Sequence, residues 1–436
     1  MEEEKKIGGS NGNTSNTSGM VLNHSEVLTM LKGASMLASG GGGSYLEAIN
    51  LLKPLSEKTL EIAPYTEGSD GSSGVIVVAL MGDPSAVKNR NFKTMILDTM
   101  TLVRKVAQSV FDDNRNNIKY CIPVEMGGFN TAVPVYLAMA TQGTTNQIRL
   151  MDADGSGRAV PGLDVTYLSQ KKCAINPFVL AGDTHITWNE VELKDNAVIY
   201  DSVSPKSCEN TARGICLSYD RLAGIAGWPF LSDKVTDYAI TNSITGAYRI
   251  GCCVNEYYIK AGRKENLFEY LNSCSIFPGF RSAMIAPLTE SQECNVIQNK
   301  STGDSFDIGE IIIEVKDRGM VIYHYAIKYI NESLVLYKVE NYLSANPVYT
   351  PVVTAPDIIT IFDLEERRAL SNDEVTEKLS IKVRLGGDFP VLLGVIDSPK
   401  WWDIKGGNAS AQTIIWKSYF QAVQYKDSCI RYFEDK

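Results

Sequence analysis

One continuous apolar run, Val75-Ile76-Val77-Val78-Ala79-Leu80-Met81, gives the first indication of how this 436-residue chain folds. A β-branched and apolar run of this length, ended by Gly82-Asp83-Pro84, is typical of a strand buried on both faces. Helical and strand patterns then alternate, with helices expected at 92–111 and 132–141 and strands at 119–124 and 147–151. Strands that alternate with helices pair in parallel through crossovers. The sequence therefore predicts an α/β domain with a largely parallel sheet.

The flanking segments complete this pattern. Two helices are expected before the first strand, at 25–38 and 45–53, on either side of Ser39-Gly40-Gly41-Gly42-Gly43-Ser44, and another helix is expected at 233–260. After about residue 278 the chain becomes rich in strands separated by turn sequences such as Asn331-Glu332. These strands are expected at 309–315, 321–330, 334–339, 358–363, 379–384 and 391–396. They predict a β-rich, antiparallel sandwich or barrel-like domain.

Three regions follow from these patterns. We expect a disordered tail at 1–20, an α/β domain carrying the site at 21–280, and a β-rich C-terminal domain at 281–436. The tail lacks the apolar segment of a signal peptide. The nine cysteines include no Cys-x-x-Cys pair, which is typical of reduced thiols. Both features favour a cytoplasmic protein.

Composition excludes two classes of partner. The net charge is −9, whereas a nucleic-acid-binding surface gathers Lys and Arg in stripes. The longest apolar run is the strand quoted above, far short of the roughly 20 residues that span a bilayer. We therefore expect a small-molecule substrate and neither a nucleic acid nor a membrane.

Several sharper motifs do not match. The glycine-rich segment at 39–44 lacks the Gly-Lys-Ser/Thr of a P-loop and the spacing of a dinucleotide fold. Asp152-x-Asp154-x-Ser156-Gly157 resembles the start of a calcium loop, but the twelfth position is Leu163 instead of Glu. Three histidines in the whole chain do not favour a zinc site. The residues assign no cofactor, and a metal-dependent carboxylate site stays open.

Acidic residues follow all three predicted parallel strands, beside glycine. They are Asp83, Glu125, and the pair Asp152 and Asp154. Ligands of an open parallel sheet bind outside the carboxyl ends of its strands, where such side chains converge. The alternative is that these residues cap helices or form turns, which we favour for Asp83. For the other three we favour a site, because neighbouring carboxyl groups separate their pKa values into an acid and a base.

Three segments also resemble one known family. Residues 32–43, 124–130 and 152–161 are similar to blocks of the S-methyl thiohydantoin desulfurase-like family, a hydantoinase/oxoprolinase-associated group. The resemblance implies an α/β N-terminal and a β-rich C-terminal domain. It also implies hydrolysis of an S-methylated thiohydantoin ring with release of methanethiol. The chain departs from the family pattern at Gly162, where an acidic residue is usual, and this leaves the substrate open.

Matching positions supply the expected site. The catalytic residues are expected to be Glu125, Asp152, Asp154 and Arg158, with Glu125 or Asp154 as general base. Arg158 and the backbone amides of Gly41, Gly42 and Gly43 would hold an anion, and Gly128 and Asn130 would complete the substrate-binding group.

Two functions remain after these steps. The first is a hydrolase that adds water, with carboxylate assistance, to a small cyclic amide, hydantoin or S-methyl thiohydantoin type substrate. The second is a non-catalytic partner subunit of a hydantoinase or oxoprolinase complex. Self-association into a homo-oligomer stays open with either function.

Overall fold

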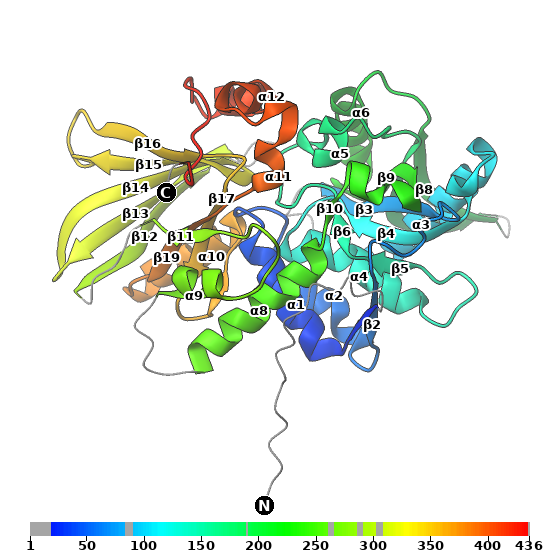
Figure 1. Ribbon diagram of the computed structural model, residues 1–436, viewed down its shortest axis with the longest axis horizontal. Coiled ribbons are helices and arrows are strands. Elements are labelled where there is room, and N and C mark those ends of the chain that lie inside the picture. Colours follow the sequence, from blue (N-terminus) through cyan, green and yellow to red (C-terminus); the bar gives the residue numbers. More distant parts are fainter. Residues whose placement is uncertain are drawn as a thin grey trace, which may run out of the picture.

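The structure, a computed structural model, describes residues 19–82, 90–188, 191–259, 266–285, 291–301 and 308–434. Of the predicted tail at 1–20 it describes only Gly19 and Met20, and Asp83 also lies outside the described residues. Figure 1 shows an α/β region on the right and a strand-rich region on the left, with helices α1 (His24–Met36) and α8 (Ser243–Ile259) in the middle. Residues far apart in sequence can therefore meet where the two regions join.

The α/β region is built on a mixed sheet with strand order β1-β2-β5-β4-β3-β9-β7-β8. Its centre, β2-β5-β4-β3, is parallel, and the outer strands run antiparallel to their neighbours. A separate two-stranded pair joins β6 to β10. The strands are β1 (Met20–Leu22), β2 (Leu60–Ala63), β3 (Gly74–Gly82), β4 (Ile118–Pro123), β5 (Arg149–Met151), β6 (Ala153–Asp154), β7 (Phe178–Trp188), β8 (Val191–Ile199), β9 (Leu222–Leu231) and β10 (Ile240–Thr241).

Strand β3 has the buried character that its sequence predicts. Ile76 and Val78 pack into one hydrophobic core, and Val75 and Val77 pack into a second core. Alternate side chains of a strand point to opposite faces, so the sheet is covered on both sides. The predicted α/β class is confirmed. Besides α1 and α8, the helices of this region are α2 (Tyr45–Leu52), α3 (Phe92–Val110), α4 (Gly128–Thr141), α5 (Tyr167–Gln170), α6 (Pro205–Ser218) and α7 (Val235–Tyr238).

The C-terminal region is rich in antiparallel strands, as predicted. Two sheets, with orders β12-β13-β14-β15-β16 and β11-β19-β17-β18, share one hydrophobic core. The strands are β11 (Ser282–Met284), β12 (Gln292–Ser301), β13 (Ile308–Asp317), β14 (Met320–Ile330), β15 (Glu332–Glu340), β16 (Val348–Thr354), β17 (Ile358–Asp363), β18 (Arg368–Ala369) and β19 (Val391–Ile396). The helices are α9 (Leu267–Ser273), α10 (Asn372–Leu385), α11 (Pro399–Trp402) and α12 (Ala409–Ala422).

The helix predicted at 233–260 is wrong as a single element. The chain forms α7, then the short strand β10, and only then α8, which ends at Ile259. Strand β10 pairs with β6, Ile240 opposite Asp154, and Asn242 has a φ of 61°, which a continuous helix cannot accommodate. This interruption places the start of α8 beside the predicted site.

The strand predicted at 379–384 is also wrong, because these residues belong to α10. Ser371 and Glu374 form a capping box at its start, and Gly386, with a φ of 67°, ends it. These end signals were present in the sequence and outweigh the β-branched residues inside the helix.

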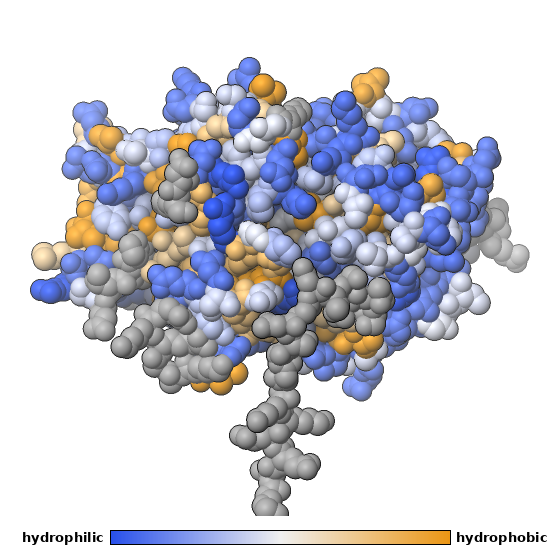
Figure 2. Space-filling model, viewed as in Figure 1, coloured by the Kyte–Doolittle hydropathy of each residue, from blue (hydrophilic) through white to orange (hydrophobic). Residues whose placement is uncertain are grey.

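The surface shows hydrophilic side chains over much of the visible face, with hydrophobic ones in smaller groups between them (Figure 2). Among the helices that the structure describes, none combines the length and the apolar composition needed to cross a bilayer.

Helices α1 and α8 approach closely through glycine. A β-carbon on Gly33 would overlap the carbonyl oxygen of Ala247, and one on Gly251 would overlap that of Thr29. Since glycine alone permits this approach, the helix pair sets the position of α8 relative to the sheet.

We predict that Gly33→Ala lowers the free energy of unfolding by about 1–3 kcal/mol or more, because the added methyl group forces the two backbones apart. The matched control is Gly214→Ala on α6, where the methyl group meets no atom within 4 Å and should stabilise the helix by about 0.5–1 kcal/mol. Urea denaturation checks both. Equal stability of the two variants would contradict the close packing.

Candidate active site

Glu125 lies just beyond the carboxyl end of β4 and is 6% exposed. Its Oε1 accepts a hydrogen bond from Asn130 Nδ2 at 2.7 Å, and its Oε2 accepts one from the backbone N–H of Val160 at 2.8 Å. Two residues of the expected site, Glu125 and Asn130, are therefore in direct contact.

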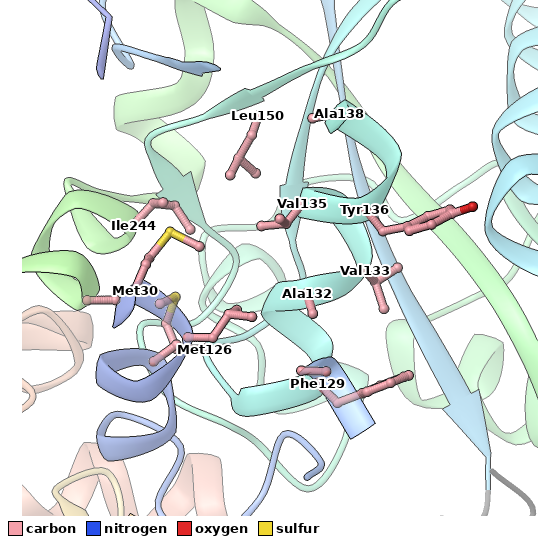
Figure 3. Close-up of a cluster of buried hydrophobic side chains, with 14 of the residues drawn as sticks. Met30, Met126, Phe129, Ala132, Val133, Val135, Tyr136, Ala138, Leu150 and Ile244 are labelled. Atoms are coloured by element: carbon pink, nitrogen blue, oxygen red, sulfur yellow. The ribbon is translucent and has the colours of Figure 1, made fainter. Parts of the chain in front are cut away.

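The hydrophobic core fixes the backbone next to Glu125. Figure 3 shows Met126, the next residue, among Met30 of α1, Leu150 of β5 and Ile244 of α8. Because Met126 is fully buried in this core, the carboxyl group of Glu125 has little freedom to turn toward solvent.

Asp154, on β6, lies next to the same strand end and is fully buried. Its Oδ2 accepts hydrogen bonds from the backbone N–H groups of Ser156 at 2.9 Å and Gly157 at 2.5 Å. The Ser156 hydroxyl in turn donates to Val124 O at 2.9 Å, which joins this turn to the residue before Glu125. The other oxygen, Asp154 Oδ1, is buried without a hydrogen-bond partner.

Burial makes both carboxyl groups hold their protons unusually well. It raises the pKa of Glu125 to about 7, opposed by the hydrogen bonds from Val160 and Asn130 and aided by the charge of Asp154. Burial likewise raises the pKa of Asp154 to about 7, against the hydrogen bonds from Ser156 and Gly157. Two carboxyl groups that titrate near neutral pH can act as a proton donor and a proton acceptor.

Asp152 faces a different neighbour. Its two carboxylate oxygens accept hydrogen bonds from the backbone N–H of Thr245 at 3.0 Å and the Thr245 hydroxyl at 2.7 Å. Its carbonyl oxygen accepts a third, from Asn242 N–H at 2.9 Å. These contacts attach the residue just before β6 to the first turn of α8, and the expected catalytic role of Asp152 stays a prediction.

Arg158 is fully buried, and its guanidinium donates to backbone carbonyl oxygens. Its Nη1 donates to Pro356 O at 2.7 Å and to Asp357 O at 2.9 Å, and its Nη2 donates to Ser333 O at 3.3 Å. Burial lowers the pKa of Arg158 to about 10, opposed by nearby carboxylates, first that of Glu332. The side chain thus links the expected site to the C-terminal region, and these N–H groups are engaged by protein oxygens.

The glycine-rich segment lies against the start of α4. The carbonyl oxygen of Gly42 accepts hydrogen bonds from the backbone N–H groups of Phe129 at 3.0 Å and Asn130 at 2.9 Å. A β-carbon on Gly42 or on Gly127 would collide with the backbone of the other residue. Gly128 is similarly close to Gly43 O. The expected residues Gly42, Gly43, Gly128 and Asn130 therefore lie together, in an arrangement that caps α4.

One residue of this group was missed by the sequence analysis. Glu332, assigned there to a turn, is the first residue of β15 and is 3% exposed. Its carboxyl group lies against Gly41, where an added β-carbon would overlap it, and its Oε2 has no hydrogen-bond partner. Burial raises the pKa of Glu332 well above the ordinary value, the charge of Glu125 adds to the rise, and Arg158 opposes it. No local motif marks this residue, because its neighbours come from distant parts of the chain.

Family models match the chain over most of its length. A model described as S-Me-THD-like, N-terminal domain, matches residues 25–188, and one described as S-Me-THD-like, C-terminal domain, matches residues 203–385. The chain belongs to the S-Me-THD-like family. The resemblance inferred from the three sequence segments is confirmed.

A solved structure supports the fold of this S-Me-THD-like protein. A structural-genomics target protein from Chromobacterium violaceum is similar, with a TM-score of 0.69 and 18% identity, over 94% of this chain and 99% of that chain. No curated protein matches this S-Me-THD-like sequence. In the described part of the chain, no three or more His, Cys, Asp or Glu side chains are arranged to hold a metal ion.

We predict that Asp154→Asn changes how the stability of this S-Me-THD-like protein depends on pH. The pKa of Asp154 is raised on folding, so between about pH 4 and about pH 7 this carboxyl group is ionised in the unfolded chain and protonated in the folded protein. The free energy of unfolding therefore falls progressively as pH rises through this range. Asparagine cannot ionise, and its amide can present oxygen to Ser156 and Gly157. The stability of the variant relative to wild type should therefore increase from pH 5 to pH 8 by on the order of 1–4 kcal/mol.

Urea denaturation at the two pH values measures this difference. Glu57→Gln, at an exposed carboxylate, is the control. A stability difference for Asp154→Asn that is the same at both pH values would show that Asp154 does not hold its proton in the folded protein.

Proposed function

We propose that the protein is a hydrolase that adds water to a small cyclic amide, hydantoin or S-methyl thiohydantoin type substrate. The observation that carries this proposal is the pair of buried, interacting carboxyl groups of Glu125, just beyond β4, and Asp154, on β6, each with its pKa raised to about 7. Family membership supports the substrate class.

The hydrogen bonds favour different roles for the two groups. Asp154 keeps one oxygen, Oδ1, without a partner, so this atom can accept a proton from an attacking water. Both oxygens of Glu125 accept N–H groups, from Asn130 and Val160, an arrangement that favours its charged form. We assign Asp154 as the general base. We assign Glu125 as the carboxylate that accepts hydrogen bonds from N–H groups of the ring or stabilises positive charge on it.

The site is closed as it stands, because Glu125 is 6% and Asp154 0% exposed. A substrate reaches them only when the layer that covers them moves. Once the substrate is enclosed, the exclusion of water strengthens the interaction of each carboxyl group with the ring.

We predict that Asp154→Asn and Glu125→Gln each reduce kcat on an S-methyl thiohydantoin or hydantoin by about 10²- to 10⁴-fold, the usual contribution of a positioned acid or base. The control Glu57→Gln should be unchanged. Steady-state turnover of purified, folded protein measures this effect. The urea denaturation of the same variants shows whether each one is folded at the assay pH, so that a loss of kcat is not caused by unfolding.

The pH profile provides a second readout. If Asp154 is the base, kcat/KM of the wild type rises with pH through about 7, as the group ionises. Full activity of both site variants would contradict the proposal. If the wild type turns over no member of the substrate class, the alternative of a non-catalytic partner subunit is favoured.

A further inference from the structure

Glu332 enters the candidate site from the C-terminal region, at the first position of β15. The next residue fixes it there, because Ser333 N–H donates to Ser39 O at 2.7 Å and the Ser39 hydroxyl donates to Ser333 O at 3.1 Å. Arg158 Nη2 also donates to Ser333 O, at 3.3 Å. The backbone next to Glu332 is therefore held both to the glycine-rich segment at 39–44, through Ser39, and to residues 152–161, through Arg158.

This backbone places the Glu332 carboxyl group near Glu125. The carboxyl group lies against Gly41, and the following residue, Gly42, touches Gly127, two residues beyond Glu125. Ser156, on the other side, donates to the carbonyl oxygen of Val124, just before Glu125. Glu125 is thus the central group: the charge of Asp154 raises the pKa of Glu125, and the charge of Glu125 raises that of Glu332.

The hydrogen bonds separate Glu332 from the other two groups. Glu125 accepts N–H donors on both oxygens and Asp154 accepts two on Oδ2, whereas Glu332 Oε2 is buried without a partner. Three such groups cannot all be charged next to one another in a site without water. The group with the fewest donors is the one best suited to keep its proton.

We propose that Glu332 is the general acid of the site and protonates the group that leaves the ring. This inference rests on the proposed hydrolase function and assigns the acid to the C-terminal region. The active site is then complete only when both regions contribute to it.

The reaction balances with these groups alone. Asp154 takes one proton from water as the water oxygen bonds to the ring carbon that carries the thioether, and the electron pair of the C=N double bond moves onto the ring nitrogen. The carbon–sulfur bond then breaks, its electron pair stays on sulfur, and the Glu332 proton moves to that sulfur to give a thiol. The electron pair on nitrogen re-forms the C=N bond as sulfur leaves, and the hydroxyl proton then moves from oxygen to this nitrogen, which gives a ring carbonyl and a ring N–H. The proton on Asp154 returns through solvent to Glu332 and restores the starting state.

Leaving-group dependence tests the acid directly. Glu332→Gln should lower kcat on an S-methyl thiohydantoin by about 10²-fold or more. On the corresponding S-(4-nitrophenyl) compound, whose thiolate leaves without a proton, the loss should be less than about tenfold. Asp154→Asn should lose activity on both substrates, because the base is needed whichever group leaves. Glu340→Gln, at the exposed end of the same strand, is the matched control.

Each outcome decides the assignment. The acid role is overturned if Glu332→Gln has wild-type activity on the S-methyl substrate, or if it loses the same activity on both substrates. In either case, the activity of Asp154→Asn still tests the proposed function. Absence of turnover by wild type on both compounds overturns the proposed function, and this inference with it. If Glu332→Gln does not fold, Glu332→Asp replaces it, and its deficit should again be larger on the S-methyl substrate.

Discussion

The exclusion of water from Glu125 and from the two carboxyl groups that interact with it, Asp154 and Glu332, is the constraint on which the rest of the site depends. Glu125, Asp154 and Glu332 are between 0% and 6% exposed. Arg158, the cation beside them, donates to backbone carbonyl oxygens, so it supplies charge without forming an ion pair with one carboxylate. Ionised carboxylates are costly to bury. This environment therefore favours the protonated forms of these three carboxyl groups at higher pH than usual.

Close backbone packing makes this burial feasible. Gly41 admits the Glu332 carboxyl group, and Gly42 and Gly127 touch without side chains between them. The same segment caps α4 through Gly42 O, which satisfies N–H groups that would otherwise need a ligand or water. The glycine-rich sequence is therefore explained by packing at the junction of the two regions, with the acidic chemistry on either side of it.

Local pattern predicted much of the fold and part of the site. The buried run at 75–81 and the alternation after it predicted the parallel centre of the sheet, because both features depend on neighbours in sequence. Glu125 and Asp154 could be expected together, since they follow strands of one sheet. The break between α7 and α8 could not be predicted from local pattern, because it depends on Ile240 pairing with Asp154, a contact between distant segments.

Glu332 and the carbonyl partners of Arg158 were beyond the reach of sequence patterns for the same reason. A turn residue before a strand carries no sign that it will be buried against a glycine almost 300 positions earlier. By contrast, the helix α10 was misread although Ser371, Glu374 and Gly386 marked its ends. The β-branched residues Ile381 and Val383 favour a strand locally, whereas the capping residues favour the helix that forms.

Infrared difference spectroscopy of the folded protein across a pH titration tests the central claim most directly. A protonated carboxyl group has a carbonyl stretch that ionisation removes. We expect such a band to persist above pH 5, to lose intensity with a midpoint near 7 as Glu125 and Asp154 ionise, and to be weaker in Asp154→Asn. Loss of all carboxyl bands by about pH 5, where ordinary Asp and Glu are ionised, would contradict it.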